Sequence, residues 1–188
     1  MSAIELFEHL RGIDAAGLMP LQRILLITDG TLTEILEAHF LERIELVKIS
    51  ERLLRGSELS ADVPTNADER VLERKINLRG EKSRTLYVYA ESFVFVDRLD
   101  PSFQTELLET NIPLGRLWLG HRLETFKEIV GIACRSAGER AKYLGCAENA
   151  PVLGRIYDVF SAGRLVMRIA ENFCAETTCV PAQTGSAG

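Results

Sequence analysis

The chain has 188 residues, of which 46% are hydrophobic and 26% are charged, a composition typical of a soluble globular protein with one full-sized core. The 27 acidic and 22 basic residues give a net charge of −5, and no long basic run is present. This balance argues against general binding to nucleic acid or to an anionic membrane, and no feature indicates an obligate protein partner.

Targeting segments and metal sites are not indicated either. The N-terminus lacks a basic segment followed by an apolar run, and no apolar run is long enough to span a bilayer, so we expect a cytoplasmic protein. The three histidines are widely separated and the four cysteines have no CxxC spacing. We therefore expect no metal site, and thiols rather than disulfides.

The first half of the chain is predicted to contain short helices followed by strands. The turn TDGT supplies Asp29 or Thr31 as a helix cap, and residues 71–79 alternate in character as a β-strand does. In chain order we expect helices at 3–12, 20–30 and 32–40, a strand at 43–50, a loop at 55–68, and strands at 71–79 and 84–96.

The second half is predicted to begin with helices and to end in a β-hairpin that turns at the tripeptide SAG. Leu123, Phe126, Val130 and Ala133 recur at helical spacing, which predicts a helix at 123–135. We further expect helices at 100–111 and 137–145, a hairpin at 152–173, and a disordered tail of small and polar residues at 175–188. These elements predict a single α+β domain over residues 1–174, with a mostly antiparallel sheet and helices on one side.

Two charged residues fall on apolar strand faces. Arg74 shares its face with Leu72, Ile76 and Leu78, and Glu171 interrupts a similar apolar row in the last strand. A buried charge costs several kcal/mol unless it is paired. One interpretation is structural: Arg74 protects a sheet edge, or pairs with Glu171. The other is a site that binds a ligand with a carboxylate at one end and a hydroxyl at the other.

Two further features are weaker candidates for a site. In the turn NIPLGR, the N–H groups of Leu114 and Gly115 are free donors if a helix begins there, although this stretch taken alone favours an ordinary turn into a helix. Glu91 lies on the strand face of Tyr87 and Tyr89, where it could belong to a site or pair with a neighbouring arginine.

Six short motifs occur in an order that resembles the chorismate pyruvate-lyase (4-hydroxybenzoate synthase) family. The likeness covers roughly residues 22–174 and is nearest to the chorismate lyase-like branch of that family. The motifs are LLITDGTLTEILEAHF, ERKINLRG, YVYAESFVFVDRL, IPLGRLW, RLETFKEI and SAGRLVMRIAENF.

The resemblance implies a small antiparallel sheet with a closed ligand pocket beneath helical flaps. It implies conversion of chorismate to 4-hydroxybenzoate and pyruvate without a metal or an organic cofactor. By position, Arg74 would bind the ring carboxylate, Glu171 the para hydroxyl and the backbone N–H of Leu114 the substrate, while Leu32 would line the pocket. Arg116 and Arg122 are weaker candidates for the pyruvyl carboxylate. Lys75 departs from the family pattern, which usually has Glu after the arginine.

Two alternatives to a chorismate lyase remain open at the level of sequence. The effector domains of one class of bacterial repressors share the family fold and bind small molecules without catalysis. In those proteins a winged helix of roughly 70 residues precedes the sheet. The first strand is expected near Ile44 here, which favours the enzyme. The second alternative is an aromatic-acid carrier or an enzyme acting on another enolpyruvyl compound.

Overall fold

The computed structural model describes residue 13 and residues 15–109, 117–118, 120–121 and 124–175. Its strands are β1 (Ile44–Arg55), β2 (Arg70–Gly80), β3 (Leu86–Phe95), β4 (Phe126–Ser136), β5 (Pro151–Ser161) and β6 (Arg164–Cys174). Its α-helices are α2 (Pro20–Ile27), α3 (Leu32–Phe40), α4 (Pro101–Glu109) and α6 (Ala141–Leu144). Short 3-10 helices are η1 (Ala15–Gly17), η2 (Gly56–Glu58), η3 (Val96–Arg98) and η4 (Gly138–Arg140).

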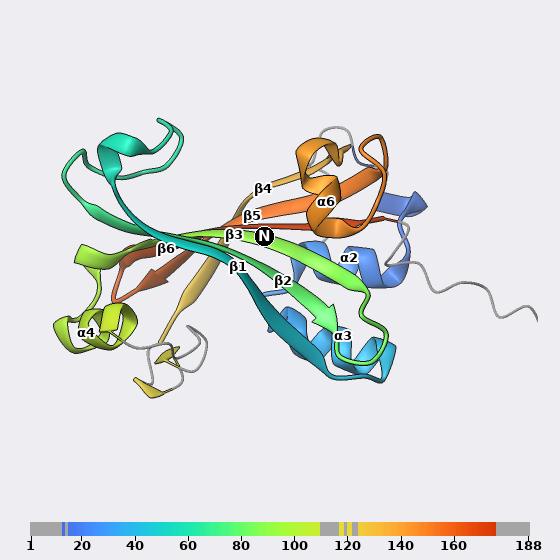
Figure 1. Ribbon diagram of the computed structural model, residues 1–188, viewed down its shortest axis with the longest axis horizontal. Helices are drawn as coiled ribbons and strands as arrows, with labels where there is room; N and C mark the ends of the chain where they lie inside the picture. Colours follow the sequence, from blue (N-terminus) through green and yellow to red (C-terminus); the bar gives the residue numbers. More distant parts are fainter. Residues whose placement is uncertain (1–12, 14, 110–116, 119, 122–123, 176–188) are drawn as a thin grey trace, which may run out of the picture.

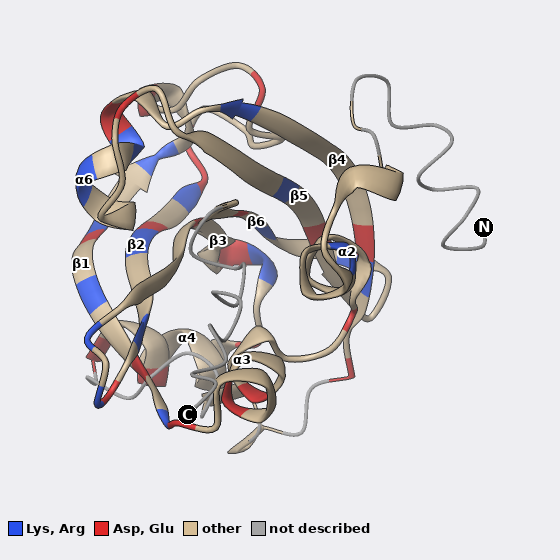
Figure 2. Ribbon diagram, turned by 90° about the vertical axis from the view of Figure 1, so that its right-hand side faces the viewer, with Lys and Arg blue, Asp and Glu red and all other residues tan. Residues whose placement is uncertain are grey.

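The six strands form one sheet in the order β1-β2-β3-β6-β5-β4, and every neighbouring pair is antiparallel. Figure 2 shows β1 on one side of the sheet and β4 on the other, with charged residues of both signs along the strands. The β5–β6 hairpin turns at Ala162 and Gly163, whose φ angles are 48° and 72°, as a tight two-residue hairpin turn requires. The α+β class and the predicted hairpin are therefore confirmed.

One face of the sheet, which we call the front face, carries most of the apolar core. It is covered at one end by α2 and α3 and at the other end by α4 (Figure 1). The first end buries Leu21, Leu25, Leu26 and Leu36 against Leu78, Val88, Leu153 and Phe173. The second end buries Phe103, Leu107 and Leu117 against Leu72, Val94, Val159 and Met167. The middle of the front face lies between these two apolar clusters.

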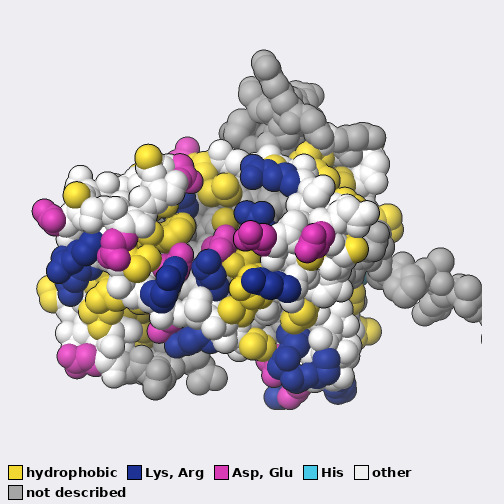
Figure 3. Space-filling view, turned by 45° about the horizontal axis from the view of Figure 1, so that its top comes forward, with side chains coloured by type: hydrophobic (Ala, Val, Ile, Leu, Met, Phe, Trp, Pro, Cys, Tyr) yellow, Lys and Arg dark blue, Asp and Glu magenta, His cyan; other side chains and the backbone are white. Residues whose placement is uncertain are grey.

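The opposite face, which we call the back face, is more polar. At one end, Ala141 and Leu144 of α6 pack against Tyr89 and Val152. Elsewhere basic and acidic side chains are interleaved, as Figure 3 shows for the side of the molecule that carries α6. The ion pairs on this face include Arg52–Glu73, Lys75–Glu91 and Arg168–Asp158. Helices therefore lie on both faces, and the prediction that they pack on one side holds for α2, α3 and α4 only.

The helix expected at 123–135 is wrong, because this segment forms the edge strand β4. A β-bulge between Ile129 and Gly131 puts Phe126 and Ala133 of the predicted stripe on the same face although they are seven residues apart. A spacing of seven residues imitates two turns of a helix. The residues that suggested the helix are largely outside the core: Phe126 is 66% exposed and Val130 is 47% exposed.

Some predicted segments lie outside the part of the chain that the structure describes. The helix at 3–12, the turn NIPLGR at 111–116 and residues 176–188 of the predicted tail lie outside the described residues. Ala175 is described, and its backbone N–H donates to the carbonyl of Pro151. Among the described residues, no helix has the length and apolar content needed to cross a membrane.

Candidate functional site

Arg74 lies in the middle of the front face and is only 6% exposed. Its neighbours across the sheet are Glu51 on β1 and Ser92 on β3. Arg74 Nε donates to Glu51 Oε2 at 2.7 Å, and no hydrogen bond from either Nη group is found among the described residues. Because a guanidinium carries five N–H donors in a planar fork, Arg74 keeps donors for a ligand carboxylate.

Glu51 fixes the position of Arg74. Partial burial raises the pKa of the Glu51 carboxyl, but hydrogen bonds from Lys48 and Arg74 outweigh this effect and lower that pKa overall. Lys48 Nζ lies 3.1 Å from Glu51 Oε1. Glu51 therefore stays ionised and orients the guanidinium toward the middle of the face.

Glu171 lies on the front face of β6 and is 8% exposed. Its Oε2 accepts a hydrogen bond from Arg155 Nε at 2.7 Å, and its Oε1 accepts one from the Tyr157 hydroxyl at 3.0 Å. Arg155 is 2% exposed, and its Nη1 also donates to the carbonyl of Thr28 at 2.5 Å. Burial and the Glu171 charge raise the pKa of Tyr157, so this phenol stays protonated and donates.

A further cation, Lys127, faces the same region from the edge strand β4. Its Nζ donates to the carbonyl of Asp29 at 2.6 Å and lies 5.7 Å from the centroid of the Tyr157 ring. Burial lowers the pKa of Lys127, and the negative charge of Glu171 partly offsets this effect. The turn between α2 and α3 thus contacts two site cations, since Thr28 accepts from Arg155 and Asp29 from Lys127.

Arg74 and Glu171 share a face but do not form an ion pair with each other. Strand β3 lies between their strands, and Glu171 is opposite Ala90, which is opposite Ile76. Two strand spacings, about 10 Å in all, separate the two backbones. The β3 residues between them, Ala90 and Ser92, have small side chains. This arrangement suits a small ligand with an anionic end near Arg74 and a hydroxyl near Glu171.

The other predicted site residues have different locations. Leu32 begins α3, is 4% exposed, and belongs to the same core cluster as Leu153 and Phe173. Glu91 lies on the back face, where it is 3.1 Å from Lys75 Nζ and accepts a hydrogen bond from the Tyr89 hydroxyl. The remaining candidates, Leu114, Arg116 and Arg122, lie outside the described residues.

Sequence reasoning missed Arg155, Tyr157 and Lys127. A signal for Arg155 was available, because it alternates with Leu153, Tyr157 and Val159 on one face of a predicted strand, as Arg74 does in its own strand. Lys127 could not be found in this way, because its segment was assigned to a helix.

Comparisons with solved structures support the fold. PhnF from Mycobacterium smegmatis superimposes with a TM-score of 0.64 at 14% sequence identity, over 81% of this chain and 67% of PhnF. The effector domain of PhnF gives a TM-score of 0.62 at 14% identity, over 80% of this chain and 92% of the domain. At this identity the likeness shows a shared fold alone.

Comparisons of sequence are more specific. A chorismate pyruvate-lyase of Mycobacterium leprae (strain TN) is 33% identical over 156 residues, which cover 80% of this chain and 72% of the relative. The chorismate pyruvate-lyase of Mycobacterium tuberculosis (strain ATCC 25618 / H37Rv) is 30% identical over 158 residues, 80% of this chain and 78% of the relative. A family model described as "Chorismate pyruvate-lyase Rv2949c-like" matches residues 26–179, so the chain belongs to the Rv2949c-like chorismate pyruvate-lyase family.

Proposed function

We propose that this protein is a chorismate pyruvate-lyase, which eliminates pyruvate from chorismate and leaves 4-hydroxybenzoate. The observation that carries the proposal is the pair of buried charges on one sheet face, Arg74 and Glu171, each held by its own partner rather than by the other. Family membership supports this choice of substrate, since relatives that share about a third of their residues with this chain are named for this reaction.

In this proposal Arg74 binds the ring carboxylate. Glu51 accepts from its Nε, which leaves the Nη groups to donate two hydrogen bonds to one carboxylate. Glu171 accepts a hydrogen bond from the ring hydroxyl. Each of its oxygens already accepts one hydrogen bond, and a carboxylate oxygen has a second lone pair for the ligand.

Lys127 is our candidate for the second carboxylate of chorismate, which belongs to the enolpyruvyl group. Its ammonium is on the Glu171 side of the site, close to the Tyr157 ring. Because C3, which carries the enolpyruvyl ether, is next to C4, which carries the hydroxyl, a cation near Glu171 is suitably placed for this group. Arg116 and Arg122 remain alternative partners for the same carboxylate.

The reaction is an elimination without net oxidation or reduction. The C3–O bond breaks, the C4 hydrogen leaves as a proton, and the ring becomes aromatic, while the released enolpyruvate takes up a proton to become pyruvate. Negative charge develops on the departing oxygen, and fixed cations in a buried site stabilise such charge. Glu171, the substrate's own carboxylate and a water molecule are the candidate acceptors of the C4 proton. The contribution of the protein is to orient the ring and to stabilise the leaving group.

Incubation of the purified, chelator-treated protein with chorismate tests the proposal. We expect pyruvate and 4-hydroxybenzoate to appear in equal amounts. Loss of turnover with chelator and its return with zinc would contradict the cofactor-free elimination.

The fold shared with the effector domain of PhnF leaves a second candidate function to test, a non-catalytic sensor of aromatic acids. In that case the protein binds 4-hydroxybenzoate or chorismate, and chorismate remains unchanged during the incubation.

A further inference from the structure

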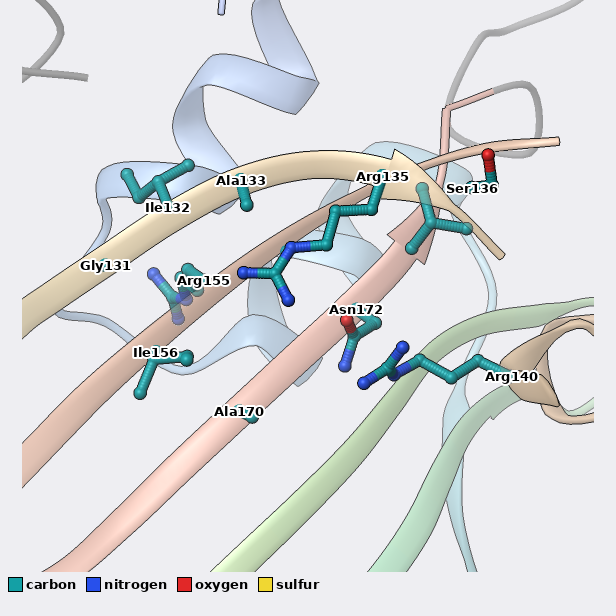
Figure 4. A pocket seen from close by; sticks show the side chains of 12 residues that line it. Gly131, Ile132, Ala133, Arg135, Ser136, Arg140, Arg155, Ile156, Ala170 and Asn172 are labelled. Atoms are coloured by element: carbon teal, nitrogen blue, oxygen red, sulfur yellow. The ribbon is translucent and has the colours of Figure 1, made fainter. Parts of the chain in front are cut away.

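The back face of the sheet contains a cavity of about 120 Å³ beside the 3-10 helix η4. It is lined by β4, β5 and β6 (Figure 4). The register places Gly131, Ile156 and Ala170 across from one another, and likewise Ala133 and Gly154. These residues alternate along their strands with those of the front face, so the cavity lies on the opposite side of the sheet from Arg74 and Glu171.

The cavity exists because several neighbouring back-face residues have little or no side chain. These residues are Gly131, Ala133, Gly154 and Ala170. A Cβ built on Gly131 would meet no atom within 4 Å, which shows that the space above it is open. Val152 and Ile156 supply apolar lining.

Three polar side chains converge on this space. Figure 4 shows the guanidinium group of Arg140, from η4, beside the amide of Asn172 on β6, and the side chain of Arg135, from β4, extending over the same space. Arg155 also borders the cavity, but Glu171 and Thr28 already accept hydrogen bonds from its guanidinium.

Among the described residues, Arg135 and Arg140 have no carboxylate partner, whereas three cations on the strands of the back face have one. Arg52, Lys75 and Arg168 each form an ion pair with an acid on a neighbouring strand. Within the described part of the chain, neither Arg135 nor Arg140 forms an ion pair or a side-chain hydrogen bond. Two like charges that converge without an anion repel each other, and an anion between them would remove this cost.

We propose that this cavity binds a small molecule through one oxyanion group, either a carboxylate or a phosphate. Arg135 and Arg140 donate to its oxygens, because a guanidinium fork matches the geometry of both groups, and the Asn172 amide supplies a further donor. The apolar part of the ligand lies against Val152 and Ile156. This site is separate from the proposed lyase site and does not depend on it.

Calorimetric titration with benzoate and with inorganic phosphate, in a buffer free of other carboxylates and phosphates, tests the proposal. We expect at least one probe to bind, and the probe whose binding is retained in Arg74→Leu identifies the oxyanion of this cavity. Arg135→Met/Arg140→Met should weaken that binding by about tenfold or more, because it removes charge-assisted hydrogen bonds. Arg164→Met, which removes an exposed arginine at the β5–β6 turn, should bind as the wild type does.

Two further variants separate the cavity from general charge and from the front face. Gly131→Val fills open space without removing a charge, and it should weaken binding while thermal melts show a folded protein. Arg74→Leu should leave phosphate binding unchanged. The proposal fails if neither probe binds, if Gly131→Val binds normally, or if Arg74→Leu abolishes binding that Arg135→Met/Arg140→Met retains.

Discussion

At the scale of single residues, the burial of Glu171 depends on Arg155. A carboxylate that is 8% exposed needs a cation beside it, and Arg155 is itself 2% exposed. Arg155→Leu should therefore lower the free energy of unfolding by about 3–5 kcal/mol, the cost of leaving a buried charge unpaired. Urea unfolding measures this loss.

The matched control is the double variant Arg155→Leu/Glu171→Gln. It removes both charges and should recover part of the lost stability. No recovery would mean that Arg155 stabilises the fold through Thr28 or through packing, rather than through Glu171.

Arg74 is expected to act on ligand affinity more than on stability. Arg74→Leu continues the apolar row of β2, and Glu51 keeps Lys48 as a partner. We predict a normal fold and a loss of about 2–5 kcal/mol in 4-hydroxybenzoate affinity, because one partner of a charge-assisted contact is removed. Thermal melts with and without 4-hydroxybenzoate measure both effects.

The conservative variant Glu171→Gln should weaken product binding less than Arg74→Leu, because the amide still forms hydrogen bonds. If both Arg74→Leu and Glu171→Gln bind 4-hydroxybenzoate as the wild type does, then the two residues are structural and not a ligand site.

Lys127 should give the proposed reaction a distinct pH dependence. Only the protonated ammonium binds a carboxylate, and burial lowers its pKa from the ordinary value of 10.5. We expect kcat/KM for chorismate to fall as the pH rises through this lowered pKa, before an exposed lysine would lose its charge. Lys127→Arg stays charged and should move the fall to higher pH. An unchanged pH profile in Lys127→Arg would exclude this role.

At the scale of elements, Glu42 stabilises the turn between β2 and β3 through hydrogen bonds. This carboxylate accepts hydrogen bonds from the backbone N–H and the hydroxyl of Ser83, the hydroxyl of Tyr87 and the backbone N–H of Lys82. They lower the pKa of Glu42 from 4.5 to about 2. The stabilisation of the folded state by the ionised Glu42 carboxylate is therefore fully present above pH 4.5 and is lost as the pH falls to about 2.

Glu42→Gln should accordingly show less loss of stability than the wild type over this acid range, measured as the urea midpoint at each pH. Glu34→Gln, which removes an exposed carboxylate on α3, serves as the control. Identical acid sensitivity in the wild type and Glu42→Gln would contradict this assignment.

The strands differ in how well their sequences predict them. Strict alternation in 71–79 predicts both β2 and the inward direction of Arg74, because a strand has a period of two. Where a strand contains a β-bulge, the alternation is interrupted and no longer predicts which residues share a face. The bulge in β1 between Lys48 and Ser50 brings Lys48 and Glu51 to one face, so the partner of Arg74 depends on a register that periodicity does not reveal.

At the scale of the whole molecule, the α+β class, the antiparallel pairing and the family follow from the sequence, because ordered motifs and strand periodicity are local signals. The grouping of Arg74, Glu171, Arg155 and Lys127 depends on contacts between β1, β2, β4, β5 and β6 and the α2–α3 turn. The sequence predicts two of the four, Arg74 and Glu171. The alternation of β5 also indicates Arg155, whereas Lys127 is apparent only when the strands are assembled.

The sheet also separates two sets of cations. The front-face set surrounds Glu171, whereas Arg135 and Arg140 line the cavity on the back face. Ligand binding to one face can therefore be tested with variants that leave the residues of the other face unchanged.

Turnover of chorismate by the wild type and by Arg74→Leu, with Arg164→Met as a control, is the most direct test of the central claim. We predict equal release of pyruvate and 4-hydroxybenzoate by the wild type and by Arg164→Met, and a loss of kcat/KM of at least tenfold in a folded Arg74→Leu protein. Chorismate that remains intact with the folded wild-type protein, or turnover that is unchanged in Arg74→Leu, would contradict the account.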